Sequence, residues 1–402
     1  MNKAKSFHHI FTPLRDLLSD SRTTGVLLVG CTLVSLFLTN SLTAGGFNHL
    51  WNNQFTPGVF STLKLPNSFI DWINNFGMAF FFVLAATEIK RELLSGELSQ
   101  FKKAVLPFGA AFGGMLMPAL IFIAFNFYSG YSHGWGIPTA TDIAFSIAAA
   151  SLLGKRFPVG LKILLLAIAI IDDLGAIIVI ALFYGGHINW FALLACGIIY
   201  GVLLLCNRMK MKFGILQILL GFALWFAMLQ SGVEASITGV LFAFAMPVNS
   251  LTIIEKAIHK WVNFFILPVF ALANTAILLP AHFANSLTSP VGMGIFFGLV
   301  VGKPLGIFLA CRIMVGLNIA SLPSNVNWKQ VFGMGTLAGI GFTMSIFTTM
   351  LAFADSGIRD IAKISILSAV IGSVVVSYFY FRTIYGRRIV AISLPQSEPS
   401  YT

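Results

Sequence analysis

Long apolar runs separated by short polar connections account for most of the chain. Twelve runs can be drawn between charged residues or Pro/Gly breaks: 23–40, 70–89, 104–125, 137–153, 159–184, 190–206, 213–230, 233–248, 261–279, 290–311, 329–353 and 362–382. A helix needs about 20 mostly apolar residues to cross a bilayer. The pattern therefore predicts an all-α polytopic membrane protein in which residues 1–402 form a single domain with about 12 transmembrane helices.

Polar and turn-forming residues interrupt two of these runs near mid-membrane. In the fourth run a proline, two threonines and an aspartate stand where a continuous helix would carry leucine or isoleucine. The eleventh run is rich in glycine, which costs a helix roughly 1 kcal/mol per residue relative to alanine. The residues concerned are Pro138, Thr139, Thr141 and Asp142, and then Gly333, Gly335, Gly339 and Gly341. We predict two discontinuous helices, with close helix packing as the alternative reason for the glycines.

The two interrupted runs occupy matching places in two triplets of runs. The fourth lies within runs 3–5 and the eleventh within runs 10–12, and their separation gives the triplets opposite starting orientations. We therefore expect two inverted-topology repeats, at about 104–184 and 290–382, whose discontinuous helices cross. Half-helix ends would then bring partial charges of about half an elementary charge to the centre of the bilayer.

The longest connection on the predicted outer side, residues 41–71, has turn-forming residues between short apolar pieces. Asn52, Asn53, Pro57 and Gly58 are typical of turns. We predict a small extracytoplasmic β-hairpin over about 45–66. An ordinary exposed loop is the alternative, because an isolated hairpin is only marginally stable.

Composition and charge agree with a membrane protein and add its orientation. Hydrophobic residues make up 57% of the chain and charged residues only 10%, compared with about 25% charged in soluble domains. Nearly all of the 25 lysines and arginines, which dominate the net charge of +11, fall on alternate connections. Cytoplasmic loops are enriched in basic residues, so both termini are expected in the cytoplasm, and no nucleic-acid partner is expected.

Cysteine and histidine show no ligand pattern. The four cysteines, Cys31, Cys196, Cys206 and Cys311, lie inside or at the edge of apolar runs and form no CxxC or Cys/His spacing. We therefore expect no disulfide, structural metal or cofactor.

Four ionisable residues lie deep inside apolar runs: Asp142, Asp172, Asp173 and Lys303. Each costs about 2.5–3.5 kcal/mol at a helix centre, so a compensating interaction or a function is required. One alternative is that these four groups only neutralise one another and so hold the helices together, but three carboxylates and one ammonium leave surplus negative charge unexplained. We hypothesise that Asp142 balances the positive half-helix ends and Lys303 the negative ones.

Asp172 and Asp173 are adjacent and are flanked by apolar residues on both sides. Neighbouring positions on a helix diverge by about 100°, so the two carboxylates can border one cavity while having different partners. One can pair with Lys303 while the other stays open for a cation. Carboxylate oxygens suit a hard cation rather than a transition metal, so the site can hold either Na⁺ or H⁺.

Several motifs resemble those of NhaA-type sodium/proton antiporters over nearly the whole chain. They are FFFVL at 80–84 leading to EIKREL at 88–93, ATDIAF at 140–145, AIIDDLGA at 169–176, VGKPLG at 301–306 and GIGFTMS at 339–345. The resemblance implies a secondary transporter, not an enzyme. It implies exchange of cytoplasmic Na⁺ or Li⁺ for external H⁺ across the bacterial inner membrane, with two H⁺ entering per Na⁺ and therefore with net charge movement.

The same resemblance assigns roles to individual residues. It implies that Asp172 and Asp173 form the ion and proton site, with Thr141 as a further Na⁺ ligand, and that Lys303 pairs with Asp172. It also implies that Asp142 and Thr141 support the crossing of the discontinuous helices. The region of the predicted hairpin matches one through which similar proteins dimerise, so a homodimer in contact with membrane lipid is expected.

Acidic residues at the cytoplasmic entrance are the expected basis of pH regulation. Glu88, Glu92 and Glu255 occupy positions that match such a group in similar proteins, although solvated helix-end charges are the alternative for each. Glu234 stands where the familiar relatives carry histidine. Because histidine titrates near neutrality unaided and glutamate does not, the pH threshold of the family cannot be carried over.

Three other functions fit the sequence less well. A Na⁺-coupled symporter of an organic substrate would need a further polar or cationic pocket. An ion channel would need a continuous filter, often built from several subunits. An intramembrane aspartyl hydrolase would carry its two aspartates on separate helices, unlike adjacent Asp172 and Asp173.

Overall fold

The computed structural model describes residues 21–41, 44–55, 65–154, 157–186, 188–280, 283–324 and 326–392. Within these ranges the secondary structure is helical and no β-strand occurs. Eight helices there are long and apolar enough to cross a membrane, or nine if a bent pair is counted as one span. The chain is therefore a multi-pass, all-helical membrane protein.

The amino-terminal two thirds of the described chain contains helices of very different length. They are α2 (Ser21–Asn40), α3 (Ala44–Asn52), α5 (Phe69–Trp72), η1 (Ile73–Gly77), α6 (Met78–Ser95), η2 (Glu97–Ser99), α7 (Phe101–Asn126), η3 (Ser132–Thr139), α8 (Ile143–Leu152), α9 (Val159–Phe183), α10 (Trp190–Arg208), α11 (Ile215–Ser231), η5 (Ala235–Ile237) and α12 (Thr238–Ala245).

The remaining third repeats this mixture of long and interrupted helices. Its elements are α13 (Val248–Trp261), η6 (Val262–Ile266), α14 (Leu267–Asn274), α15 (Phe283–Thr288), α16 (Pro290–Phe297), η7 (Gly298–Gly302), α17 (Lys303–Gly316), α18 (Trp328–Ala338), α19 (Phe342–Ala352) and α20 (Ser356–Ile392). The π-helical turns η1, η6 and η7 lie inside otherwise continuous spans. Such turns are frequent at functional sites, and η7 ends immediately before Lys303.

Both predicted interruptions are present. In the fourth run, η3 and α8 are separated by the extended residues 140–142. In the eleventh run, α18 and α19 are separated at 339–341 and are bent by 49° relative to each other. The glycines also serve close packing, the predicted alternative, because a Cβ at Gly335 would lie 2.7 Å from the Cα of Pro304.

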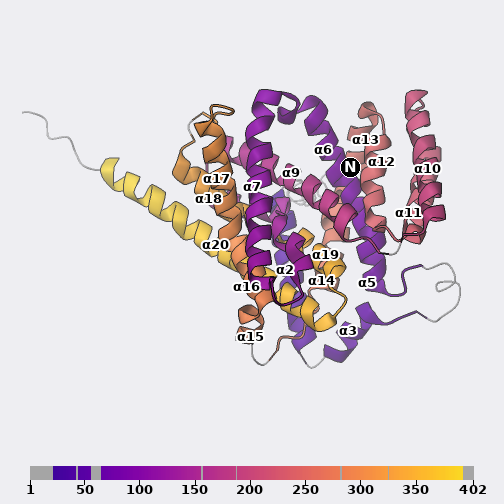
Figure 1. The fold of residues 1–402 in the computed structure, drawn as a ribbon, viewed down its shortest axis with the longest axis horizontal. Helices are drawn as coiled ribbons and strands as arrows, with labels where there is room; N and C mark the ends of the chain where they lie inside the picture. Colours follow the sequence, from indigo (N-terminus) through magenta and orange to yellow (C-terminus); the bar gives the residue numbers. More distant parts are fainter. Residues whose placement is uncertain are drawn as a thin grey trace, which may run out of the picture.

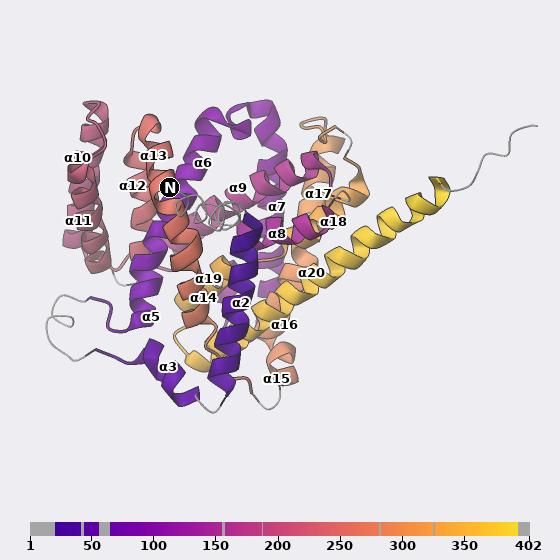
Figure 2. The same cartoon turned by 180° about the vertical axis from the view of Figure 1, so that it is seen from behind.

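Helices α10 and α11 lie side by side at one edge of the molecule, and α20 slopes away at the opposite edge (Figures 1 and 2). Helix α9 runs through the interior: 67% of the residues in its most apolar 18-residue stretch are buried, compared with 17% in that of α10. Many exposed residues of α10 are large and apolar, as for Phe191 at 87% exposure, which suits contact with lipid. The middle of α9, which carries Asp172 and Asp173, is therefore buried among its neighbours, whereas its ends are partly exposed.

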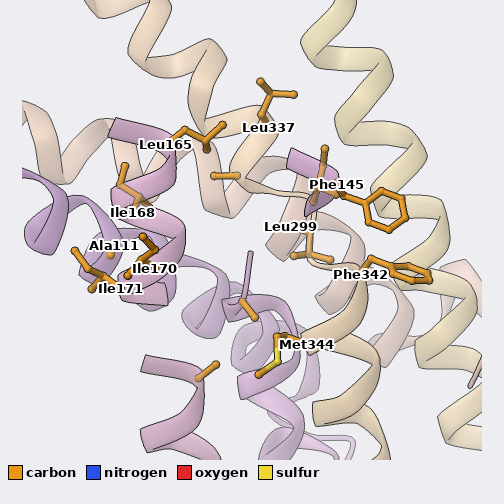
Figure 3. Close-up of a cluster of buried hydrophobic side chains, with 14 of the residues drawn as sticks. Ala111, Phe145, Leu165, Ile168, Ile170, Ile171, Leu299, Leu337, Phe342 and Met344 are labelled. Carbon is orange, nitrogen blue, oxygen red and sulfur yellow. The ribbon is translucent and has the colours of Figure 1, made fainter. Parts of the chain in front are cut away.

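Apolar side chains pack around the two interruptions. Phe145 of α8 and Phe342 of α19 lie with ring centroids 4.8 Å apart, and Leu299 and Leu337 lie beside them (Figure 3). Ile168, Ile170 and Ile171, which precede the aspartates on α9, are also buried (Figure 3). This packing removes water from the surroundings of the ionisable groups, which strengthens every charge interaction there.

Two details of the prediction differ from the structure. The hairpin over 45–66 is not confirmed: residues 45–52 belong to α3, and residues 56–64 lie outside the described residues. The ninth run, 261–279, is offset from its helix, which begins at Val248 and reaches Asn274. Polar residues of α13, such as Lys256 and Lys260, broke the apolar run although they extend from one exposed side of the helix.

Helices α7 and α17 approach each other closely at two glycines. A Cβ on Gly306 would lie 2.1 Å from the carbonyl oxygen of Gly113, and a Cβ on Gly113 would lie 2.5 Å from the carbonyl oxygen of Gly306. Only glycine permits backbones to approach so closely. This contact holds the first turn of α17, and with it Lys303, against α7.

Gly306→Ala is expected to destabilise the protein by about 1–3 kcal/mol, because the added methyl group would collide with backbone that cannot rotate away. The measurement is the thermal unfolding midpoint of the purified protein in detergent. Gly201→Ala is the matched control, since a Cβ at Gly201 of α10 would meet no atom within 4 Å. Equal midpoints for the two variants would show that the α7–α17 contact is not tight.

Candidate ion-binding site

Asp142 joins the two interrupted helices. Its N–H donates to the carbonyl oxygen of Ile340 at 2.6 Å, and its Oδ2 accepts from the N–H and the hydroxyl of Thr343 at 3.1 and 2.7 Å. Its Oδ1 accepts from the N–H of Phe145 at 3.1 Å. The carboxylate thus lies at the amino ends of both α8 and α19, where the helix dipoles are positive.

Hydroxyl groups donate to carbonyl oxygens next to the interruptions. Ser146 of α8 donates to the carbonyl oxygen of Leu337 in α18 at 2.9 Å, and Ser345 of α19 donates to that of Ile137 in η3 at 2.7 Å. Each interrupted helix therefore supplies a hydroxyl to the other. The exchange matters because an unpaired backbone group in a membrane interior costs several kcal/mol.

Lys303 neutralises one of the adjacent aspartates. Its Nζ lies 2.7 Å from Oδ2 of Asp172, and both side chains are fully buried. The ammonium also donates to the carbonyl oxygen of Thr139, at the carboxyl end of η3. Lys303 therefore faces two negative groups, a carboxylate and a helix end.

Thr141 lies between this ion pair and the crossing. Its Oγ1 is 2.7 Å from Oδ2 of Asp172 and 2.8 Å from the carbonyl oxygen of Ala338. One hydroxyl proton serves only one acceptor at a time. Thr141 can thus shift its proton between the carboxylate and the backbone, and its oxygen has lone pairs for a cation.

Asp173 has a different environment from its neighbour. It is 4% exposed, it forms no hydrogen bond or ion pair with any described residue, and its Oδ1 is buried without a partner. The side chain lines a cavity of about 110 Å³ together with Glu88, Thr141, Asp142 and Thr343. Three carboxyl groups therefore face one small cavity, and the described lining residues include no lysine or arginine.

The predicted regulatory residues divide into separate groups. Glu88 lines the cavity, whereas Glu255 pairs with Arg91 and Glu92 is not among the lining residues. Glu234 caps η5 by accepting a hydrogen bond from the N–H of Ser236 at 3.3 Å, and it does not line the cavity either. Of the four, only Glu88 shares a cavity with Asp173.

Several contributors to the site were not assigned from the sequence. The hydroxyl of Thr343 donates to Asp142. His259 and Asn263 line the cavity, with Nε2 of His259 3.1 Å from Nδ2 of Asn263. Thr343 belongs to the motif GIGFTMS at 339–345. Its hydroxyl group, close after the glycines of the interruption, was the feature of the sequence that could have indicated its role. His259 and Asn263 carried no signal, because their helix reaches the site only in the tertiary structure.

Comparisons with known proteins agree with one another. The model of the Na⁺/H⁺ antiporter 1 family matches residues 15–381. The chain is 41% identical over 388 residues to the Na(+)/H(+) antiporter NhaA 2 of Clostridium beijerinckii, covering 93% of this chain and 96% of that protein. It is 43% identical over 382 residues to the Na(+)/H(+) antiporter NhaA of Flavobacterium psychrophilum, covering 94% and 97%. The chain therefore belongs to the Na⁺/H⁺ antiporter 1 family.

Proposed function

We propose that this chain is a secondary transporter that exchanges cytoplasmic Na⁺, or Li⁺, for external H⁺ at Asp172 and Asp173. The observation that carries the proposal is the unpaired carboxylate of Asp173 in a buried acidic cavity. A buried charge without a counterion is unfavourable by several kcal/mol. Asp173 is therefore stable when it holds either a proton or a cation, and this competition is what antiport requires.

The neighbouring groups fit complementary roles. Thr141 supplies a further oxygen ligand to Na⁺, and oxygen ligands suit a hard cation. Asp172 stays neutralised by Lys303 until Na⁺ competes for its carboxylate, at which point the pair releases the second proton. Asp142 is a positioning residue, since its oxygens are occupied by the amino ends of α8 and α19.

The membrane topology proposed for this function has twelve spans with both termini in the cytoplasm of a bacterium, within its inner membrane. Nine of these spans are the long helices, counting the bent pair as one. The other three contain the shorter apolar helices Ile143–Leu152, Ile215–Ser231 and Ala235–Ala245. The reciprocal contacts of Ser146 and Ser345 support inverted repeats at about 104–184 and 290–382. The distribution of basic residues supports the orientation.

The proposal includes net charge movement, regulation by pH and a homodimer. Two H⁺ entering per Na⁺ leaving moves one positive charge inward, which is worth about 2.3 kcal/mol per 100 mV. Glu88 is the foremost candidate for regulation by pH because it lines the cavity of Asp173. Further candidates for the same regulation are Glu92, Glu255 and Glu234. The segment over 45–66 is the proposed dimer contact.

The relatives support exchange rather than symport. Proteins named Na(+)/H(+) antiporters match more than nine tenths of this chain, and the acidic cavity of about 110 Å³ suits an ion more than an organic substrate.

Asp173→Asn is expected to abolish Na⁺-dependent proton movement, because an amide can neither release a proton nor neutralise Na⁺. The measurement is the collapse of ΔpH on adding NaCl to everted vesicles, across pH 6 to 9. Asp71→Asn is the control, an aspartate near the amino end of α5 whose carboxylate accepts from Ser68, and it should retain exchange. Unchanged exchange in Asp173→Asn vesicles would remove this carboxylate from the mechanism.

Lys303→Gln is expected to lower stability by about 3–5 kcal/mol, because it leaves the carboxylate of Asp172 buried without its partner. Adding Asp172→Asn should restore most of the loss, since both charges are then absent. The measurement is thermal unfolding of the single and double variants in detergent. A double variant no more stable than Lys303→Gln alone would mean that the pair is not the dominant interaction of either residue.

A further inference from the structure

A second cavity lies apart from the ion site. Its volume is about 710 Å³, within the usual range for small-molecule pockets. The walls come from α3, the segment after α14, the end of α19 and the first turns of α20, and α3 lies at one end of the molecule (Figure 1). None of its lining residues is shared with the cavity of Asp173.

Lys363 is the buried charged group of this cavity. It is only 6% exposed, and the carboxylate of Asp360, one helical turn before it, attracts its charge. Burying an ammonium group costs several kcal/mol unless a negative group compensates it, and Asp360 is shared with the guanidinium of Arg359. Its side chain lines the cavity, so the cavity is where a compensating negative group can reach it.

The groups around Lys363 also decide which ligand charge the cavity favours. Arg359, one helical turn away, donates to the carbonyl oxygens of Phe353 and Met350 at 2.5 and 3.1 Å, so its cation is held at the cavity wall. Asp360 is the one carboxylate among the described lining residues, and Asp71 and Asp355 also act on Arg359 from outside the lining, so Lys363 is the cation that these carboxylates compensate least. The positive end of the α20 dipole begins at Ser356, also in the wall.

Hydrogen-bond donors complete the lining. Asn48, Asn52, Asn53 and Gln54 line the cavity from α3 and the residues after it, and the amide of Asn52 donates to Asn48. Amide N–H groups and an ammonium are the donors with which proteins bind phosphate and carboxylate groups. A sodium ion, in contrast, would meet two fixed cations.

We propose that this cavity binds a small oxyanion, a phosphate or carboxylate group, with Lys363 as its principal ligand. The group belongs either to a free anion or to the headgroup of an anionic phospholipid. In the orientation proposed above the cavity opens on the extracytoplasmic side. Only that placement rests on the proposed function; binding itself does not require exchange.

The test is a titration of the purified full-length protein with inorganic phosphate at constant ionic strength, in detergent without phospholipid, with thermal stability and calorimetry as readouts. The wild type should be stabilised saturably. Lys363→Gln should weaken binding by about tenfold or more, as expected for loss of a charge-assisted hydrogen bond, and Lys363→Arg should retain it. Lys260→Gln, at an exposed lysine of α13, is the control and should bind like the wild type.

Asp360→Asn keeps the proposal testable if Lys363→Gln does not fold. It removes the one carboxylate of the described lining and should tighten phosphate binding several-fold, an effect with the opposite sign from simple destabilisation. The same titration in nanodiscs of phosphatidylcholine, with or without phosphatidylglycerol, separates the two sources. Phosphate binding that persists with phosphatidylglycerol identifies a free anion, whereas its loss there identifies a headgroup.

Two results would overturn the oxyanion site. One is a wild type that responds saturably neither to phosphate nor to phosphatidylglycerol. The other is equal binding by Lys363→Gln and Lys260→Gln. Neither result bears on exchange, because the titration measures no transport and the vesicle assay contains no phosphate-dependent step.

Discussion

The site depends on one constraint: two helices are interrupted inside a membrane protein, and each interruption leaves polar backbone that water cannot reach. The two interruptions satisfy each other. Asp142 accepts hydrogen bonds at the amino ends of α8 and α19, while Ser146 and Ser345 donate to carbonyl oxygens of the opposite helix. These contacts between the two interruptions hold Asp142, and the Thr141 hydroxyl that binds Ala338 beside it, in place.

Charge is distributed unevenly around this crossing. Lys303 compensates Asp172 and the carboxyl end of η3, and the helix amino ends compensate Asp142. No described residue compensates Asp173. In the proposed function this carboxylate holds either one cation or one proton, which links the stability of the protein to what its site holds.

Tight packing between helices keeps the arrangement in place. Gly113 and Gly306 bring α7 and α17 into backbone contact, so the backbone of Lys303, three residues before Gly306, is held against α7. The cavity around Lys363 lies at a distance from the ion site, and its described lining residues include two basic side chains and one carboxylate. In the functions proposed above, the acidic cavity receives a cation and the cavity of Lys363 receives an anion.

The apolar runs determined most of the helices, because a bilayer leaves only hydrogen-bonded helices available to long apolar segments. Pro138 and Gly339–Gly341 marked the interruptions, and Asp142, Asp172, Asp173 and Lys303 stood out by their cost in such surroundings. The ends of α13, and the helix α3 where a hairpin was expected, depended on packing that local sequence does not encode. The residues by themselves left open which aspartate pairs with Lys303, because partner choice is set by helices distant in sequence; the resemblance implied Asp172, and the tertiary structure contains that pair. Only the tertiary structure brought Lys363 to the wall of a cavity.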